Sequence, residues 1–196
     1  MLLFDLGGVV IDCAKFNKIL EWQNWTSRIS EIEAKWQESE TVERYRKGEI
    51  GTKEFAETII MELDLTVNIS RFLREFRLLP KGFYPGADDL LKKLSSNYLT
   101  VCLSNTNEMH WKKLCSVNRL EKFFKYTFPS HLIHKVKPEA EAFAHVLDTL
   151  KVDPAQVAYF DDRPENVEAA MKAGMDAFKT DGFGELCGRL HELEIF

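Results

Sequence analysis

The hydrophobic positions of the chain fall into short uninterrupted runs that are separated by longer amphipathic stretches. Four runs stand out, at residues 1–4, 99–103, 157–160 and 175–178, the last of them weaker because an aspartate interrupts it. Apolar runs without polar alternation are typical of strands that are buried on both faces. The pattern therefore predicts an α/β fold with a parallel sheet covered by helices.

Helical patterns occupy the segments between these runs. Residues 87–95 carry leucines at helical spacing, and residues 164–173 stop at Gly174, which suits a helix C-terminus. Residues 138–150 begin with a proline, which is favoured in the first turn of a helix. Strands and helices thus alternate through the second half of the chain, as in an open α/β sheet.

The alternation stops between the first and second runs. The segment from about residue 14 to residue 79 contains no convincing strand, and Phe55, Ile59 and Leu63 recur at intervals of four, as on one face of a helix. We interpret this segment as a small helical bundle inserted after the first strand.

Composition narrows the class of protein and its partners. The 196 residues are 45% hydrophobic and 29% charged, which indicates a globular chain rather than a disordered one. A net charge of -5 does not favour nucleic acid or an anionic membrane as a partner. The four cysteines form no C-x-x-C pair, and no signal peptide or transmembrane segment is evident, so we expect a cytoplasmic protein. The oligomeric state stays open.

Polar side chains follow three of the predicted strands. Asp5 comes after the first run, Ser104 and Asn105 after the second, and Asp161 and Asp162 after the third. Ligands of open parallel sheets bind at the carboxyl ends of the strands, so these groups should meet at one edge.

Lys137 adds a positive charge to this set. It precedes a proline, so its backbone should be extended and its side chain can project from a loop at the same edge. A carboxylate can attack phosphorus, further carboxylates can hold Mg²⁺, and a hydroxyl and a lysine can offset charge on the transferring group. The combination predicts phosphoryl transfer.

Four segments together resemble a known family. They are residues 4–10 (FDLGGVV), 103–107 (LSNTN), 137–139 (KPE) and 160–166 (FDDRPEN). In order and spacing they resemble the four motifs of the haloacid dehalogenase-like hydrolase superfamily. The resemblance implies a Rossmann-like parallel-sheet core and an inserted helical cap of the four-helix-bundle type. We place the core at residues 1–13 and 80–196 and the cap at residues 14–79.

The resemblance also implies roles for the acidic residues. Asp5 would be the nucleophile and a ligand of Mg²⁺, and the backbone carbonyl of Gly7 would face the same ion. Asp162 would be the direct metal ligand, because it lies four residues before the polar Asn166. Asp161 would assist directly or through water.

The phosphate-binding roles follow in the same way. Ser104 would bind the phosphoryl oxygens, helped by the backbone or side chain of Asn105. Lys137 would pair with Asp5 and with the phosphate. The alternative, purely structural role for Ser104 is that of a helix N-cap, which is common for serine.

The implied activity is a magnesium-dependent phosphatase acting on a small phosphorylated metabolite through an aspartyl phosphate. Phosphatases of this family usually carry a second aspartate two residues after the nucleophile, where this chain has Gly7. The Asp-Leu-Gly start resembles a branch that includes sugar-phosphate phosphatases. Two alternatives stay open: a 2-haloacid dehalogenase-like hydrolase, and a weakly catalytic phosphate-ligand binder or regulatory protein, which Gly7 favours.

Two groups in the insert receive structural interpretations. The three tryptophans of the segment are expected in the bundle core rather than in a ligand site. The positive charges near residue 46 are expected on a solvated face, although the family resemblance implies that a cap residue selects the substrate, so one of them could reach the site. These residues are Trp22, Trp25, Trp36, Arg44, Arg46 and Lys47.

Overall fold

The centre of the protein is a five-stranded parallel sheet. The computed structural model describes residues 1–14 and 29–196. Across the sheet the strands follow the order β5-β4-β1-β6-β7, and every neighbouring pair is parallel. Their bounds are β1 Leu2–Phe4, β4 Thr100–Ser104, β5 Tyr126–Pro129, β6 Ala158–Asp161 and β7 Asp176–Lys179.

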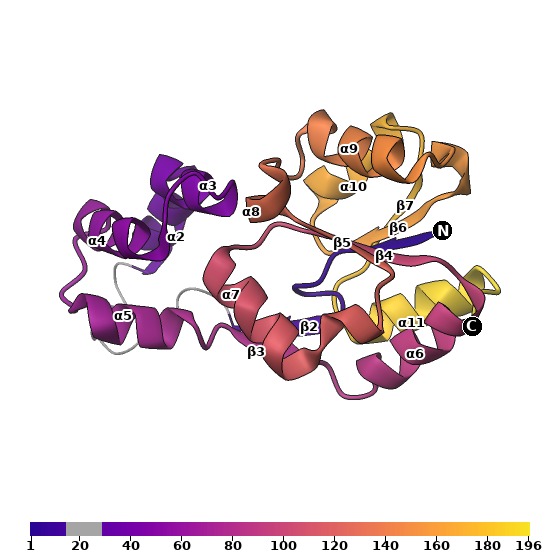
Figure 1. The fold of residues 1–196 in the computed structure, drawn as a ribbon, viewed down its shortest axis with the longest axis horizontal. Helices are drawn as coiled ribbons and strands as arrows, with labels where there is room; N and C mark the ends of the chain where they lie inside the picture. The colour runs from indigo at the N-terminus through magenta and orange to yellow at the C-terminus, as the bar shows by residue number, and fades with distance from the viewer. Residues whose placement is uncertain (15–28) are drawn as a thin grey trace.

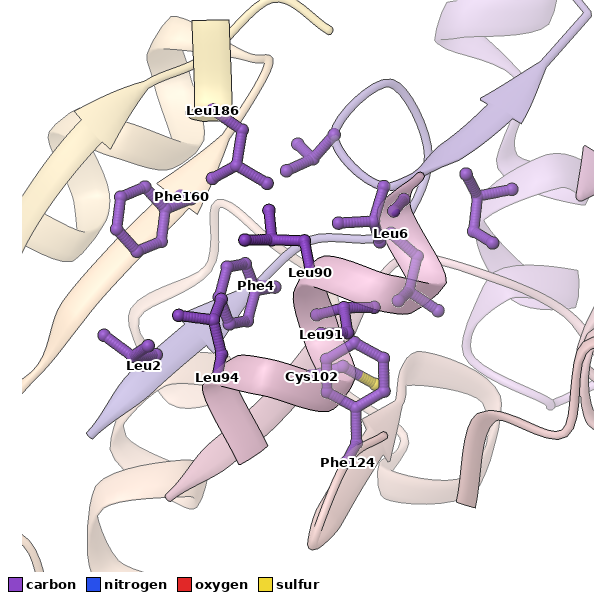
Figure 2. Packing of buried hydrophobic residues seen from close by; sticks show 14 of the residues in the cluster. Leu2, Phe4, Leu6, Leu90, Leu91, Leu94, Cys102, Phe124, Phe160 and Leu186 are labelled. Atoms are coloured by element: carbon purple, nitrogen blue, oxygen red, sulfur yellow. The ribbon is translucent and has the colours of Figure 1, made fainter. Parts of the chain in front are cut away.

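Strand β1 lies in the middle of the sheet and is buried on both faces. Leu2 and Phe4 belong to one hydrophobic cluster, whereas Leu3 belongs to another. Successive side chains of a strand point to opposite faces, so these three residues join the sheet to both helical layers. Figure 2 shows the first cluster, in which the ring of Phe4 stacks on Phe160 at a centroid distance of 5.2 Å.

Two pairs of helices cover the two faces of the sheet (Figure 1). Helices α6 (Ala87–Asn97) and α11 (Phe183–Glu192) pack against the Phe4 face through leucines such as Leu90 and Leu186. Helices α9 (Ala140–Leu150) and α10 (Pro164–Lys172) pack against the Leu3 face. The all-parallel sheet between two helical layers confirms the predicted α/β fold.

Short helical segments connect the remaining parts of the core. Four of them lie on either side of β5, and a single 3-10 turn precedes β6. Their bounds are α7 Glu108–Lys113, the π-helical η2 Leu114–Asn118, the 3-10 turns η3 Leu120–Lys122 and η4 Pro154–Gln156, and α8 Ser130–Ile133.

The insert forms a group of helices beside the sheet, at the left of Figure 1. Its described helices are α2 Ile29–Glu38, α3 Glu40–Arg46, α4 Thr52–Glu62 and α5 Ile69–Phe76. They enclose an aromatic core of their own, in which Phe55 stacks on Tyr45 at a centroid distance of 4.1 Å. Trp36 packs there as expected, whereas Trp22 and Trp25 lie outside the described residues.

A second, antiparallel sheet joins the insert to the core. Strand β2 (Ile11–Cys13) pairs with β3 (Pro80–Phe83), and the register shifts between Asp12 and Cys13. The chain therefore enters and leaves the insert through two adjacent strands. None of the described helices is long and apolar enough to cross a membrane.

Three details differ from the sequence-based expectations, and the first is the antiparallel pair β2 and β3, which no predicted strand covers. Strand β5 does not appear among the predicted strands, because its four residues include a threonine and a proline and lie at the sheet edge. Pro138 does not start a helix: α9 begins at Ala140, after a cis peptide between Lys137 and Pro138.

Candidate active site

Three carboxylates meet where β1 and β6 end. Asp5 follows β1, Asp161 is the last residue of β6, and Asp162 follows it. One oxygen of each carboxylate lies within 4.8 Å of the others. Because β1 and β6 are parallel neighbours, the strand pairing itself brings together acids that are more than 150 residues apart in the chain.

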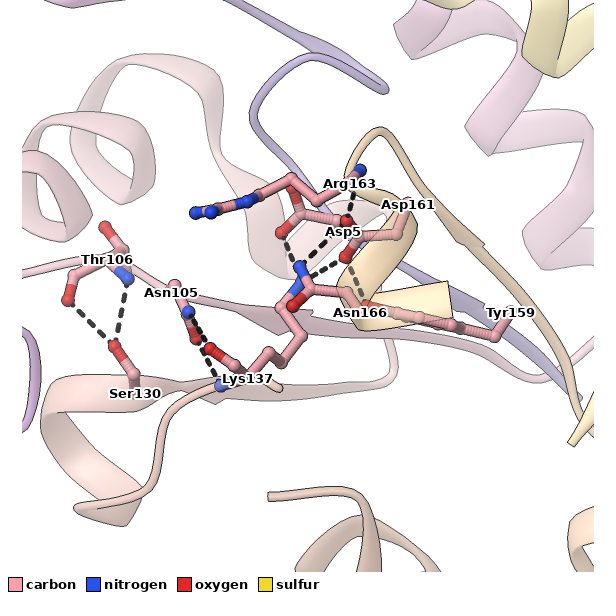
Figure 3. Close-up of polar contacts among 9 residues, drawn as sticks. All are labelled: Asp5, Asn105, Thr106, Ser130, Lys137, Tyr159, Asp161, Arg163 and Asn166. Atoms are coloured by element: carbon pink, nitrogen blue, oxygen red, sulfur yellow. Dashed lines mark hydrogen bonds and ion pairs between the residues drawn. The ribbon is translucent and has the colours of Figure 1, made fainter. Parts of the chain in front are cut away.

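Lys137 lies between two of these acids and is almost completely buried (Figure 3). Its Nζ donates hydrogen bonds to Oδ1 of Asp5 at 2.8 Å and to Oδ2 of Asp161 at 2.6 Å. Buried charges are stable only when they are paired and hydrogen-bonded, and this ammonium meets both conditions. The predicted pairing of Lys137 with Asp5 is therefore present in the structure.

Asn105 holds the backbone of Lys137 in place. Its side-chain amide donates to the carbonyl oxygen of Lys137 at 2.7 Å, and its Oδ1 accepts from the Lys137 amide at 2.8 Å. The side chain of Asn105 therefore fixes the lysine loop. Asn105 also lines the cleft described below, and the phosphate-binding role that the family resemblance implies stays a prediction.

Asp161 uses both carboxylate oxygens within the protein. Oδ2 accepts from Lys137 and from the hydroxyl of Tyr159, and Oδ1 accepts from the amide of Arg163 and the side chain of Asn166, each at 2.9 Å. Asp161 has no exposed surface and does not line the cleft described below. These contacts suit a residue that positions Lys137.

Asp162 has a different environment. It is partly exposed and lines the cleft beside Asp5. Gly8, at φ +78°, lets the backbone pass directly beside this carboxylate, because a Cβ at residue 8 would overlap Oδ2 of Asp162. A glycine at residue 8 is thus required by the position of Asp162.

Ser104 is buried at the carboxyl end of β4 and lines the same cleft. The N-cap of the following helix, α7, is Asn107, whose Oδ1 accepts from the amide of His110 at 3.0 Å. The N-cap alternative for Ser104 is therefore wrong.

The charges of the site are strongly coupled. Burial raises the pKa of Asp5, and the neighbouring Asp161 raises it further against the opposing effect of Lys137. Burial alone would lower the pKa of Lys137, but Asp5 and Asp161 outweigh it and the pKa is raised. Burial, followed by the charges of Asp5 and Asp161, raises the pKa of Asp162 to about 7. The site therefore carries an excess of negative charge that a cation would relieve.

This excess predicts a pH-dependent stability of the metal-free protein. The pKa of Asp162 is about 7 in the folded protein and 3.8 ordinarily, so between these pH values the folded state holds a proton that the unfolded state has lost. The free energy of unfolding therefore falls as the pH rises from 3.8 to about 7. The gain in unfolding temperature from Asp162→Asn should grow from about pH 4 to about pH 7 and then level off. Thermal unfolding in chelator across this range measures it. Asp148→Asn on exposed α9 surface is the control, and a gain independent of pH would contradict the prediction.

The cleft above the acids has a volume of about 470 Å³. Both the core and the insert line it. Its walls include Asp5, Ser104, Lys137 and Asp162 from the core and Arg46 from α3 of the insert. The expectation that Arg46 and Lys47 belong to a solvated face is wrong: Arg46 is partly buried in this cleft, and Lys47 forms ion pairs with Glu43 and Glu139 at 2.7 and 2.8 Å.

Gly7 lines the cleft at the point where related phosphatases carry an acid. A Cβ at residue 7 would contact Sγ of Cys13 at 3.3 Å. The thiol of Cys13 therefore occupies the space next to the missing side chain. Although Cys13 is exposed as a residue, the surroundings of its sulfur and the nearby charge of Asp5 raise the pKa of the thiol. Cys13 is accordingly protonated at neutral pH.

The sequence reasoning missed Tyr159 and expected Arg46 mainly on a solvated face. Tyr159 shares a strand face with Asp161, because residues two apart on a strand point the same way. Arg46 lies four residues after the buried Val42, which places both on one side of α3. Both spacings are visible in the sequence, but neither residue belongs to the four motifs.

Comparison with known proteins agrees with the fold. A family model described as haloacid dehalogenase-like hydrolase matches residues 2–179. A HAD family enzyme of Bacteroides thetaiotaomicron, in a complex with magnesium and inorganic phosphate, is 28% identical with a TM-score of 0.79, covering 92% of this chain and 94% of that chain.

Two curated proteins are also similar. Flavin mononucleotide hydrolase 1 of Arabidopsis thaliana is 28% identical over 151 residues, which are 72% of this chain and 61% of that protein, less than two thirds of its length. Sesquiterpene phosphatase astK of Aspergillus oryzae is 26% identical over 194 residues, which are 97% of this chain and 94% of that protein.

The parallel sheet, the acids at its carboxyl edge and these matches define the class of protein as a hydrolase. The chain belongs to the haloacid dehalogenase-like hydrolase family, as its four motifs predict, and it is an enzyme.

Proposed function

We propose that the protein is a magnesium-dependent phosphatase that hydrolyses a small phosphate monoester through an aspartyl phosphate on Asp5. The observation that carries this proposal is the group of three carboxylates within 4.8 Å, two of which share the ammonium of Lys137. Phosphatase names among the similar proteins support it, as does the magnesium and phosphate complex of the Bacteroides enzyme.

The donor groups fit Mg²⁺. All three are carboxylates, and hard cations such as Mg²⁺ prefer oxygen ligands. Asp5 and Asp162 line the cleft and would hold the ion directly, whereas Asp161 is occupied by Lys137, Tyr159 and Asn166. The carbonyl of Gly7 would face the same ion. When bound, the ion offsets negative charge on the transferring phosphoryl group.

The protein groups have separate tasks in the proposed reaction. A carboxylate oxygen of Asp5 attacks phosphorus as the bond to the leaving oxygen breaks, and Lys137 and Ser104 bind the phosphoryl oxygens. Water then attacks the phosphorus of the aspartyl phosphate, which releases phosphate and restores the carboxylate. Because Gly7 provides no acid, the leaving oxygen takes its proton from water, so good leaving groups should react fastest.

Residues 14–79 act as a cap in this proposal. Helix α3 brings Arg46 to the cleft wall, so the insert covers the site and can exclude bulk water during the reaction. The names of the similar proteins, a flavin mononucleotide hydrolase and a sesquiterpene phosphatase, imply substrates that have only a phosphate group in common, and a sugar phosphate also fits the proposed class.

Hydrolysis of an aryl phosphate with and without Mg²⁺ tests the function. We expect turnover that needs added Mg²⁺ and falls to background in chelator, together with a higher unfolding temperature in Mg²⁺ because the ion binds only the folded site. Turnover that persists in chelator would contradict the magnesium requirement. Release of halide from a 2-haloacid, without turnover of phosphates, would instead establish the dehalogenase alternative.

A catalytically weak phosphate binder is the second candidate, and Gly7 beside Cys13 favours it. Calorimetry with Mg²⁺ and inorganic phosphate separates the two. Binding with only trace turnover of aryl phosphates would identify the weakly catalytic binder, whereas efficient turnover would identify the phosphatase.

A further inference from the structure

A second cavity lies outside the catalytic cleft, where α7 of the core meets the insert (Figure 1). Its volume is about 390 Å³, within the usual range of small-molecule sites, about 300–1,000 Å³. Among the described residues, none lines both this cavity and the catalytic cleft, so the two are separate. The lining consists of Thr52, Arg77, Glu108, Met109, Lys112 and Lys113.

Positive charge dominates the lining of this cavity. Arg77 comes from the end of α5 in the insert, and Lys112 and Lys113 come from α7 in the core. Glu108, the one acid of the lining, accepts a hydrogen bond from the hydroxyl of Thr52 at 3.3 Å. Three cations and one acid leave an excess of two positive charges, which favours an anionic ligand.

In the part of the chain that the structure describes, none of these three cations forms an ion pair. Lys113 donates instead to the backbone carbonyl of Pro80, whereas Arg74, three residues before Arg77, pairs with Glu75 at 3.2 Å. Burial and then the charge of Arg77 lower the pKa of Lys113, which agrees with two cations that face each other. An anion bound between them would relieve their repulsion.

The cavity adjoins contacts that join the insert to the core. The ring of His110 on α7 stacks on Phe76 of α5 at a centroid distance of 4.3 Å, and its Nε2 donates to the carbonyl oxygen of Phe76 at 2.7 Å. Met109 packs against the aromatic core of the insert. A ligand that contacts both Arg77 and Lys112 therefore bridges the insert and the core.

We propose that this cavity binds a small oxyanion, a carboxylate or a phosphate, through Arg77, Lys112 and Lys113. A guanidinium offers paired donors that match both groups, and each ammonium adds a mobile positive charge. Because Asp5 does not line the cavity, the ligand is an effector rather than a substrate. Its binding favours the arrangement in which the insert covers the catalytic cleft. This inference does not depend on the proposed phosphatase function.

Calorimetric titration of the metal-free protein with citrate, and separately with inorganic phosphate, tests the site. In chelator the catalytic acids keep their excess of negative charge, which disfavours anions in the catalytic cleft. We expect at least one anion to bind wild type with a millimolar or tighter Kd and to raise the unfolding temperature. The anion that binds more tightly identifies the group as carboxylate or phosphate. The double variant Arg77→Gln, Lys112→Gln should bind it roughly tenfold or more weakly, because charged hydrogen bonds are lost.

Two further variants make the comparison specific. The double variant Arg74→Gln, Lys92→Gln changes the net charge equally at exposed positions outside the cavity and should bind as wild type does. Glu108→Gln removes the acid of the lining and should strengthen binding severalfold. Absence of binding of both anions to wild type, or equal affinity in the cavity variant and the control, would overturn the proposal.

Hydrogen exchange tests whether the bound anion bridges the insert and the core. In wild type the tighter anion should slow exchange of the amides of α7 and of the end of α5, because local opening then requires loss of the ligand. The cavity variant Arg77→Gln, Lys112→Gln should show no such slowing. Binding to wild type without any change of exchange in these helices would refute the bridging role.

Discussion

Replacement of Asp5 by asparagine should lower kcat by roughly 10⁴-fold or more and leave the protein folded. An amide cannot attack phosphorus as a carboxylate does, so the aspartyl phosphate no longer forms. The shape of the side chain is kept. Because the pKa of Asp5 is raised in the folded protein, its charge is unfavourable there, and removing it should not lower the unfolding temperature at pH 8.

Steady-state hydrolysis of an aryl phosphate in Mg²⁺ gives kcat, and circular dichroism on heating gives the unfolding temperature. Asp12→Asn is the matched control: Asp12 lies on β2 near the cleft but pairs with Lys81 at the surface, at 2.9 Å. The control should keep its activity. Retention of full activity in Asp5→Asn would refute Asp5 as the nucleophile.

Replacement of Lys137 by methionine should both destabilise the protein and remove most of its activity. Removing one partner of a buried ion pair typically costs about 3–5 kcal/mol, which lowers the unfolding temperature by roughly 6–20 °C for a chain of this size. Loss of the charge that binds the phosphoryl oxygens should lower kcat by about 100-fold or more. Metal-free protein should show the largest effect on stability, because the carboxylates then repel each other without any cation.

The cause of this destabilisation can be isolated with a double variant. In the double variant Lys137→Met, Asp5→Asn, one of the carboxylates that Lys137 neutralises is also removed. The unfolding temperature of the double variant should therefore be higher than that of Lys137→Met alone. Lys135→Met, two residues away and outside the network, should leave unfolding and activity unchanged. If the double variant is no more stable than the single one, lost packing rather than charge explains the effect.

The sheet and its polar edge were predictable because they depend on local sequence. An uninterrupted apolar run such as Leu2–Phe4 is sufficient to indicate a strand buried on both faces, and the acid that follows it must lie at the strand's carboxyl end. Parallel pairing then brings Asp5 to Asp161 without any further information. The site acids were found for this reason, whereas Lys137 was found from the proline that follows it and from the family resemblance.

Contacts between distant segments were not predictable in this way. The amide of Asn105 could face a substrate or a backbone, and only the folded loop shows that Lys137 receives both of its hydrogen bonds. Arginine is a residue type that usually lies at the surface, so the sequence does not place Arg46 in the cleft. Its position depends on how α3 packs against Ser130. Such docking is set by the tertiary packing of the insert, which the local pattern of α3 does not contain.

The double hydrogen bond between Asn105 and Lys137 reduces the entropy that the enzyme must lose when substrate binds. It ties the end of β4, which carries Ser104, to the loop that carries the ammonium, so the two move as one rigid body. A ligand that meets both groups then finds their spacing already set, and its binding energy is not consumed in ordering two independent loops. The fixed spacing of Ser104 and Lys137 thus depends on the side-chain amide of Asn105.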